Sequence, residues 1–77
     1  MTIQFQPGVW RHFKGQEYLA LGLARDDETD ELLVIYVRLY ARSGVPMSAR
    51  KLSVWNQQVE HHGEQVPRFE YIGQISP

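Results

Sequence analysis

The stretch Leu32–Tyr40 (LLVIYVRLY) carries the clearest strand pattern in this chain of 77 residues. Aliphatic, β-branched and aromatic side chains favour strands, and successive side chains of a strand point to opposite faces. One face of this strand would be purely aliphatic, with Leu33, Ile35, Val37 and Leu39. The opposite face would be aromatic and basic, with Val34, Tyr36, Arg38 and Tyr40. We predict a central strand that buries its aliphatic face in the core.

Two runs before this strand predict a β-hairpin. Val9–Phe13 favours a strand, Lys14-Gly15 supplies a turn, and Glu17–Ala24 follows as the second strand. Glycine adopts the positive φ that tight hairpin turns require. Leucines alternate with mostly smaller residues along the second run, which predicts one buried row formed by Leu19, Leu21 and Leu23. Gly22 interrupts that run and predicts a β-bulge or a close approach of another backbone segment.

The remaining segments predict loops and short strands. The acidic segment Asp26–Glu31 is expected to form a solvated loop, and Ser43–Pro46 ends the central strand. Met47–Trp55 stays open between a strand and a helical turn, because Leu52 and Trp55 are three positions apart. The C-terminal part predicts a second hairpin and a final strand, in the order Val59–His61, the turn His62-Gly63, Glu64–Val66 and Arg68–Ile72.

About five short antiparallel strands and no long helix predict an all-β fold. The chain is short enough that we expect a single domain over residues 1–77. We expect the sheet to close into a small barrel, because closure removes the unpaired edges that strands otherwise expose.

Composition and charge narrow the classes of function. The chain has no cysteine, which excludes thiolate chemistry and fits a reducing, cytoplasmic compartment. Eight Lys and Arg against nine Asp and Glu give a net charge of -1, so no global positive field attracts nucleic acid. The charges are unevenly spread, however: Arg25–Glu31 contains five carboxylates, whereas Arg38–Lys51 contains four cations and no acid. The N-terminus has no pattern of a secretory signal, and no apolar run approaches the roughly 20 residues of a membrane helix, so we expect no membrane partner.

The sequence predicts no catalytic residue, metal site or cofactor. His12 lies between Arg11 and Lys14, and these cations would keep it neutral, but no nucleophile or carboxylate follows at a spacing that would complete a catalytic set. His61 and His62 are adjacent, so on a strand they would point to opposite faces and could not easily share an ion. The acidic segment lacks the glycine-centred spacing of a calcium loop.

Much of the chain resembles a bacterial family called Domain of Unknown Function 1653. Its opening pattern, P-G-x-[YW]-R-H-[YF]-K-G-x-x-Y-x-x-x-G-x-A-R, is matched by Pro7, Gly8, Trp10, Arg11, His12, Phe13, Lys14, Gly15, Tyr18, Gly22, Ala24 and Arg25. A Y-x-x-L-Y element follows at Tyr36, Leu39 and Tyr40, and a V-P-R-F element at Val66, Pro67, Arg68 and Phe69. The chain departs from the family at Asp26-Asp27, where members have His-Ser, and at Ser48–Lys51, where they have Trp-Val-Arg-Pro. The resemblance covers residues 7–72 and implies an SH3-like β-barrel without an assigned activity.

The aromatic and basic face of the central strand is the candidate binding site. Arginine forks bind carboxylate or phosphate groups, and aromatic rings stack on bases or cradle a peptide. The candidate ligand-binding residues come from this strand and from segments that could flank it: Arg11, His12, Tyr36, Arg38, Arg50 and Arg68. In the competing interpretation, the tyrosines pack as a second small core and the arginine stems cover them.

These observations do not define a function. We expect a small binding or accessory module, whose partner could be an anionic small molecule, a peptide or a nucleic acid. A nucleic-acid-binding barrel is the alternative. A small enzyme comes third, because no residue pattern supports catalysis.

Overall fold

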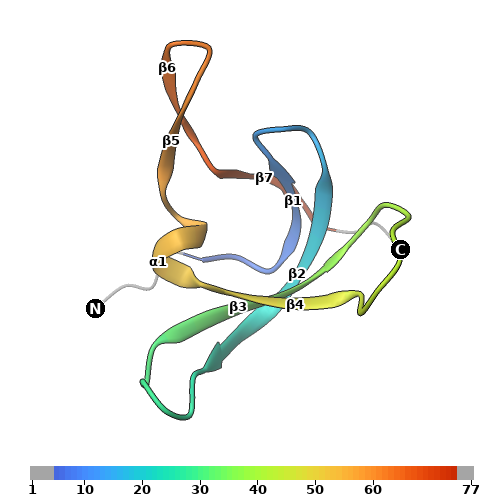
Figure 1. The fold of residues 1–77 in the computed structure, drawn as a ribbon, viewed down its shortest axis with the longest axis vertical. Helices are drawn as coiled ribbons and strands as arrows, with labels where there is room; N and C mark the ends of the chain where they lie inside the picture. Colours follow the sequence, from blue (N-terminus) through green and yellow to red (C-terminus); the bar gives the residue numbers. More distant parts are fainter. Residues whose placement is uncertain (1–4, 75–77) are drawn as a thin grey trace.

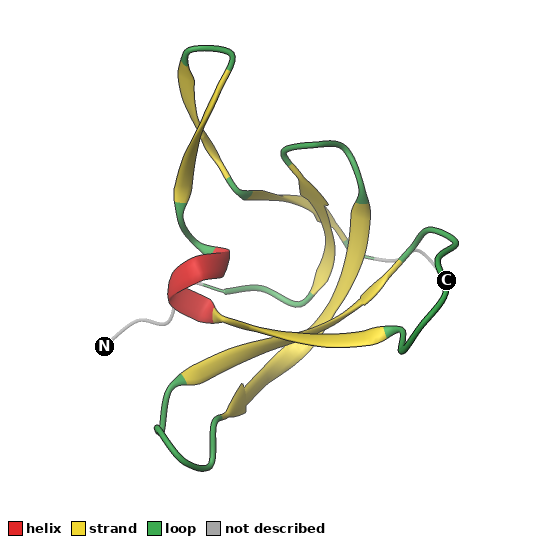
Figure 2. Cartoon of the chain, viewed as in Figure 1, coloured by secondary structure: helices red, strands yellow, loops and turns green. Residues whose placement is uncertain are grey.

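The computed structural model describes residues 5–74, and most of them lie in strands (Figure 1). In chain order the elements are β1 (Gly8–His12), β2 (Glu17–Arg25), β3 (Leu32–Arg38), β4 (Met47–Lys51), α1 (Leu52–Trp55), β5 (Gln58–His61), β6 (Glu64–Pro67) and β7 (Phe69–Gly73). The all-β prediction is confirmed. Met47–Trp55, left open above, contains both a strand and the single turn of α1, which connects β4 to β5 (Figure 2).

The strands form an open, bent sheet and a separate hairpin. The antiparallel sheet has the order β4-β3-β2-β1-β7, and β5 pairs only with β6 among the described residues. The β5–β6 hairpin projects away from the larger sheet (Figure 1). Closure into a barrel would require pairing between the edge strands β4 and β7, and the described residues show none. The expected barrel closure is therefore not observed.

Both predicted hairpins are confirmed. Each has a turn residue with positive φ, which explains why a glycine lies between the two strands. Between β1 and β2, Gly15 has φ of 107° and its N–H donates to the carbonyl of His12 at 2.7 Å. Between β5 and β6, His62 and Gly63 have φ of 53° and 80°. Two successive residues with positive φ match the twist of a tight hairpin, which is why a glycine occupies the second position.

The predicted β-bulge is present in β2 and changes which side chains face the core. Ala20 pairs with Tyr36 and Gly22 pairs with Ile35, so Leu21 is the extra residue. The extra residue shifts the alternation by one position. Ala20 is therefore buried before the bulge, Leu23 packs against the core after it, and Leu21 is exposed. The predicted single row of leucines is broken for this reason.

The core lies on the inner face of the sheet, which we define as the face that carries Val34 and Tyr36. Its buried hydrophobic residues are Ala20, Val34, Tyr36, Trp55 and Phe69. Trp55 from α1 and Phe69 from β7 stack with ring centroids 3.8 Å apart and an interplanar angle of 5°. The core thus forms where the helical turn and the last strand bring two aromatic rings onto the central strand.

The prediction that the aliphatic face is buried is wrong. Leu21 and Leu39 are each 47% exposed, and the described residues Leu19, Leu33, Ile35 and Val37 are only partly buried. Large aromatic rings provide the most area for burial, and those of Trp10, Trp55 and Phe69 all contribute to the core beside Tyr36. The opposite face, which we call the outer face, is not fully buried by any described segment. None of the described residues forms a helix that is long and apolar enough to cross a membrane.

Candidate functional site

The structure separates the six predicted site residues into four groups. Arg11 lies at the surface, where its guanidinium pairs with the Glu17 carboxylate at 2.8 Å. Tyr36 is only 7% exposed and belongs to the core, so the expectation that it lies on an exposed binding face is wrong. Arg38 holds the loop that follows β3. Only His12, Arg50 and Arg68 remain together: His12 and Arg50 contact the Phe69 ring, and the charges of Arg50 and Arg68 both act on His12.

The Arg38 guanidinium organises the loop between β3 and β4. It donates to the carbonyl oxygens of Val45 and Arg42 at 2.9 Å, Ser43 at 3.2 Å and Gly44 at 2.9 Å. A planar fork with several donors suits this set of carbonyls. The guanidinium is thus engaged within the protein, and its contacts indicate a structural role.

Phe69 is the centre of the remaining cluster. One of its ring contacts is the stack on Trp55. The His12 ring meets it at a centroid distance of 5.0 Å and an interplanar angle of 75°, and the guanidinium carbon of Arg50 lies 5.4 Å from its centroid. Arg50 is on the inner side of β4, because the alternate residues Met47, Ala49 and Lys51 are exposed. We call His12, Arg50 and Arg68 the cationic cluster.

His12 is held in a neutral form with a defined tautomer. Its Nδ1 accepts a hydrogen bond from the Lys14 backbone N–H at 3.2 Å, so in the neutral ring the proton is on Nε2. Burial, followed by the positive charges of Arg50, Arg68 and Lys14, lowers the pKa of His12 below 6.5. No carboxylate contributes to this shift. His12 can therefore donate a hydrogen bond from Nε2 at neutral pH without being charged.

The two arginines of the cluster differ in how they are held. The Arg68 Nη2 donates to the Gln57 side-chain oxygen at 3.1 Å, and its backbone N–H donates to the Gln57 carbonyl at 2.8 Å. Its Nε is buried and has no hydrogen-bond partner among the described residues. Arg50 forms no ion pair with a described carboxylate. The cluster therefore holds donor capacity that the described protein atoms do not use.

A pair of tyrosines borders the cationic cluster: Tyr40, which the sequence placed on the aromatic and basic face, and Tyr18, which was not predicted as a site residue. The hydroxyl oxygens of Tyr18 and Tyr40 lie 3.0 Å apart. The Tyr18 ring contacts Phe69 at 5.8 Å and Tyr36 at 5.3 Å between centroids. Burial, then the hydrogen bond to Tyr40, raises the pKa of Tyr18 to about 12. The signal that could have identified Tyr18 is its spacing of two from Ala20, which places both on the same side of β2 ahead of the bulge.

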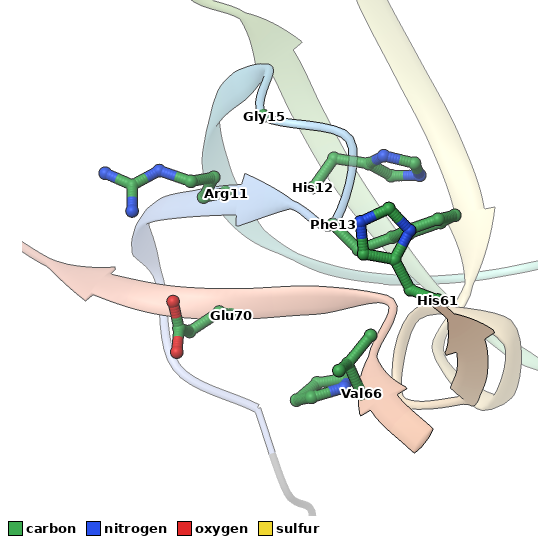
Figure 3. Close-up of a pocket in the computed structure, with 8 residues that line it drawn as sticks. Arg11, His12, Phe13, Gly15, His61, Val66 and Glu70 are labelled. Atoms are coloured by element: carbon green, nitrogen blue, oxygen red, sulfur yellow. The ribbon is translucent and has the colours of Figure 1, made fainter. Parts of the chain in front are cut away.

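A groove of about 280 Å³ lies beside the cluster, between the β1–β2 turn, the β5–β6 hairpin and β7 (Figure 3). Arg11 and Glu70 face each other across β1 and β7 at one end. Phe13 and His61, with ring centroids 5.3 Å apart, lie at the other end with Val66. His12 belongs to this lining as well as to the cationic cluster. No sequence pattern indicates this groove, because it joins segments about 50 residues apart.

The two adjacent histidines do not behave as predicted. Their rings lie 4.1 Å apart between centroids, rather than on opposite faces of a strand. The reason is that His62 is the turn residue with positive φ, so strand alternation does not apply to it. No group of three potential metal-ligating side chains occurs within residues 5–74.

The fold and the cluster together define the class of protein: a small all-β domain whose open antiparallel sheet brings the side chains of His12 and Arg50 onto the buried ring of Phe69. Comparison with known proteins supplies the family. The family described as "Protein of unknown function (DUF1653)" matches residues 8–71, and the chain belongs to this family. The resemblance noted in the sequence is thereby confirmed.

Comparison with solved structures gives a close structural relative. The chain is similar to the crystal structure of a protein belonging to DUF1653 from Bordetella bronchiseptica, with 58% sequence identity and a TM-score of 0.89. The match covers 96% of this chain and 95% of that one. No curated protein matches this chain. Neither the family description nor the solved relative assigns an activity.

Proposed function

We propose that this protein is a binding module for a small anionic ligand, and that the cationic cluster of His12, Arg50 and Arg68 is its site. The observation that supports this proposal most directly is that His12 and Arg50 meet at the Phe69 ring, with Arg68 close to His12 and no described carboxylate paired with either arginine. Protein cations that converge in a partly buried position normally have a counter-charge, since an unpaired charge is costly to desolvate. A bound anion would supply that charge.

The donor set suits a phosphate or carboxylate group. Arginine offers a planar fork for two oxygens, and the neutral His12 offers its Nε2 proton. Phe69 is 3% and Tyr36 7% exposed, so neither of these two rings offers an open surface on which a nucleobase could stack. These features favour a small anion over a nucleic acid.

NMR titration with inorganic phosphate at constant ionic strength tests this function. We expect phosphate to raise the pKa of His12, because a nearby anion favours the imidazolium. We expect Arg50→Ala to weaken phosphate binding about tenfold or more, the equivalent of losing one charge-assisted hydrogen bond. Arg25→Ala is the matched control, because Arg25 is an exposed arginine that pairs with Asp27 and Asp30 at the far end of β2.

Two results would overturn this function. One is a His12 pKa that does not change when phosphate replaces chloride. The other is an equal loss of phosphate binding in Arg50→Ala and Arg25→Ala, which would indicate non-specific screening. A second titration, with a single-stranded oligonucleotide, tests the alternative function of nucleic-acid binding. Such binding would weaken steeply with added salt, with a slope set by the number of phosphates contacted.

A further inference from the structure

The outer face of the sheet carries a group of apolar side chains from β2, β3 and β4, none of which is fully buried by the described part of the chain. On β4 and β3, Met47 is paired with Val37, and Ala49 with Ile35, and on β2 Leu19 is paired with Val37. Leu21, the extra residue of the bulge in β2, lies next to these pairs. We call Leu19, Leu21, Ile35, Val37, Met47 and Ala49 the apolar patch. Leu21 is 47% and Met47 54% exposed. Contiguous apolar surface of this kind on a small domain marks an interaction site.

Opposite charges border the two ends of the apolar patch. The loop from Asp26 to Glu31, between β2 and β3, contains five carboxylates. Only some of these are paired within the chain, through Arg25 and Lys51. The loop between β3 and β4 contains Arg42 and no acid. Figure 1 shows these loops at opposite ends of β3.

This arrangement is complementary to itself. If a second copy is placed on the patch with its β3 antiparallel to the first, apolar side chains meet in the middle. Each acidic loop then lies beside the basic loop of the other copy, at both ends at once. A two-fold axis through the patch generates such an interface, in which the same surface of both copies is used. A parallel arrangement would instead oppose like charges.

We propose that the apolar patch is the interface of a homodimer, in which two copies pack outer face to outer face with antiparallel β3 strands. A second copy fits better than a membrane, because the acidic loop would be repelled by anionic lipid headgroups. The dimer covers the side chains of Leu21 and Met47, which the single chain leaves exposed, and the partly buried apolar side chains beside them. It leaves the cationic cluster free, because that cluster is on the inner face. The dimer therefore does not depend on the proposed anion site.

Sedimentation velocity of the full chain over a concentration series tests the dimer. We expect a dimer at micromolar concentrations, and Leu21→Lys to weaken association at least tenfold, because a charge would be buried in the middle of the interface. Ile72→Lys is the matched control: Ile72 is a comparably exposed residue, at 43%, on β7 at the other edge of the sheet. Circular dichroism establishes that both variants are folded.

Charge reversal tests the antiparallel arrangement independently. Glu28→Arg and Arg42→Glu are each expected to weaken the dimer, and the chain with both changes is expected to regain association, because each acid–base contact is re-formed with its signs exchanged. A wild-type chain that stays monomeric at several hundred micromolar would overturn the proposal. So would equal association of wild type and Leu21→Lys. Failure of the double variant to regain association would exclude the antiparallel arrangement.

Discussion

Val34 and Ile35 are neighbours on β3 whose side chains meet different surroundings. Val34 is fully buried beneath Trp55 and Phe69 in the core, whereas Ile35 lies on the outer face and is only partly buried. The free-energy cost of truncating a side chain depends on how much of it is buried. We expect Val34→Ala to lower the free energy of unfolding by about 2–3 kcal/mol, and Ile35→Ala by about 1 kcal/mol or less, although isoleucine loses more atoms. Urea denaturation of both variants checks this order. A larger cost for Ile35→Ala under monomeric conditions would show that the outer face is covered in the single chain.

His12 is the residue whose titration should be visible in the stability of the protein. Its pKa is lowered from 6.5 in the folded chain by burial and by Arg50, Arg68 and Lys14, so below pH 6.5 the unfolded chain binds more protons. The free energy of unfolding therefore falls as the pH drops from 6.5 towards the folded pKa, and its His12 contribution is constant above this range. Thermal melts at pH 7 and pH 5 measure the change in Tm. We expect His12→Gln to reduce this change, and Arg50→Ala to raise the His12 pKa measured by NMR. An unaltered pH dependence in His12→Gln would mean that other groups are responsible.

At the scale of single elements, the strands β1 and β2 place their glycines under different constraints. Gly8 has φ of 137°, and a Cβ there would lie 2.8 Å from the Gly73 carbonyl oxygen and 3.0 Å from a ring carbon of Tyr71. Gly22, at the bulge, has no atom within 4 Å of the same position and no left-handed φ. We expect Gly8→Ala to destabilise the protein by about 2–4 kcal/mol through strain and overlap. Gly22→Ala is expected to be neutral or stabilising by up to about 1 kcal/mol, because it restricts the unfolded chain. Differential scanning calorimetry of the two variants decides between these outcomes, and an equal loss in both would contradict the account of the bulge.

For the whole molecule, we expect folding to be independent of metal ions. The chain has no cysteine, and no group of three potential ligands occurs in the described part of the chain. A structural metal would make the melting temperature sensitive to chelation, because its binding free energy would be part of the folding free energy. We expect the Tm in excess EDTA to equal that in buffer within error. A fall of several degrees, reversed by adding one particular divalent ion, would refute this.

The sequence alone was sufficient for most elements of this protein, since local chemistry decides them, but it left open the segment Met47–Trp55, which contains β4 and α1. Branched and aromatic residues placed β3, glycines placed both hairpin turns, and Gly22 marked the bulge in β2. The all-β class and the family followed from the same local patterns.

Only the tertiary structure decided which face of the sheet is buried and which side chains form the candidate site. The alternation of side chains along β3 shows that its two faces differ. Both faces carry groups that can be buried, so which face is buried depends on the segments that cover it. Trp55 and Phe69, far along the chain, cover the side with Tyr36 and leave Ile35 and its neighbours outside. The same long-range packing brings Arg50 to the ring of Phe69 beside His12. Alternation along a strand is a local property, whereas burial is set by contacts between residues that are distant in sequence, and no local pattern specifies those contacts.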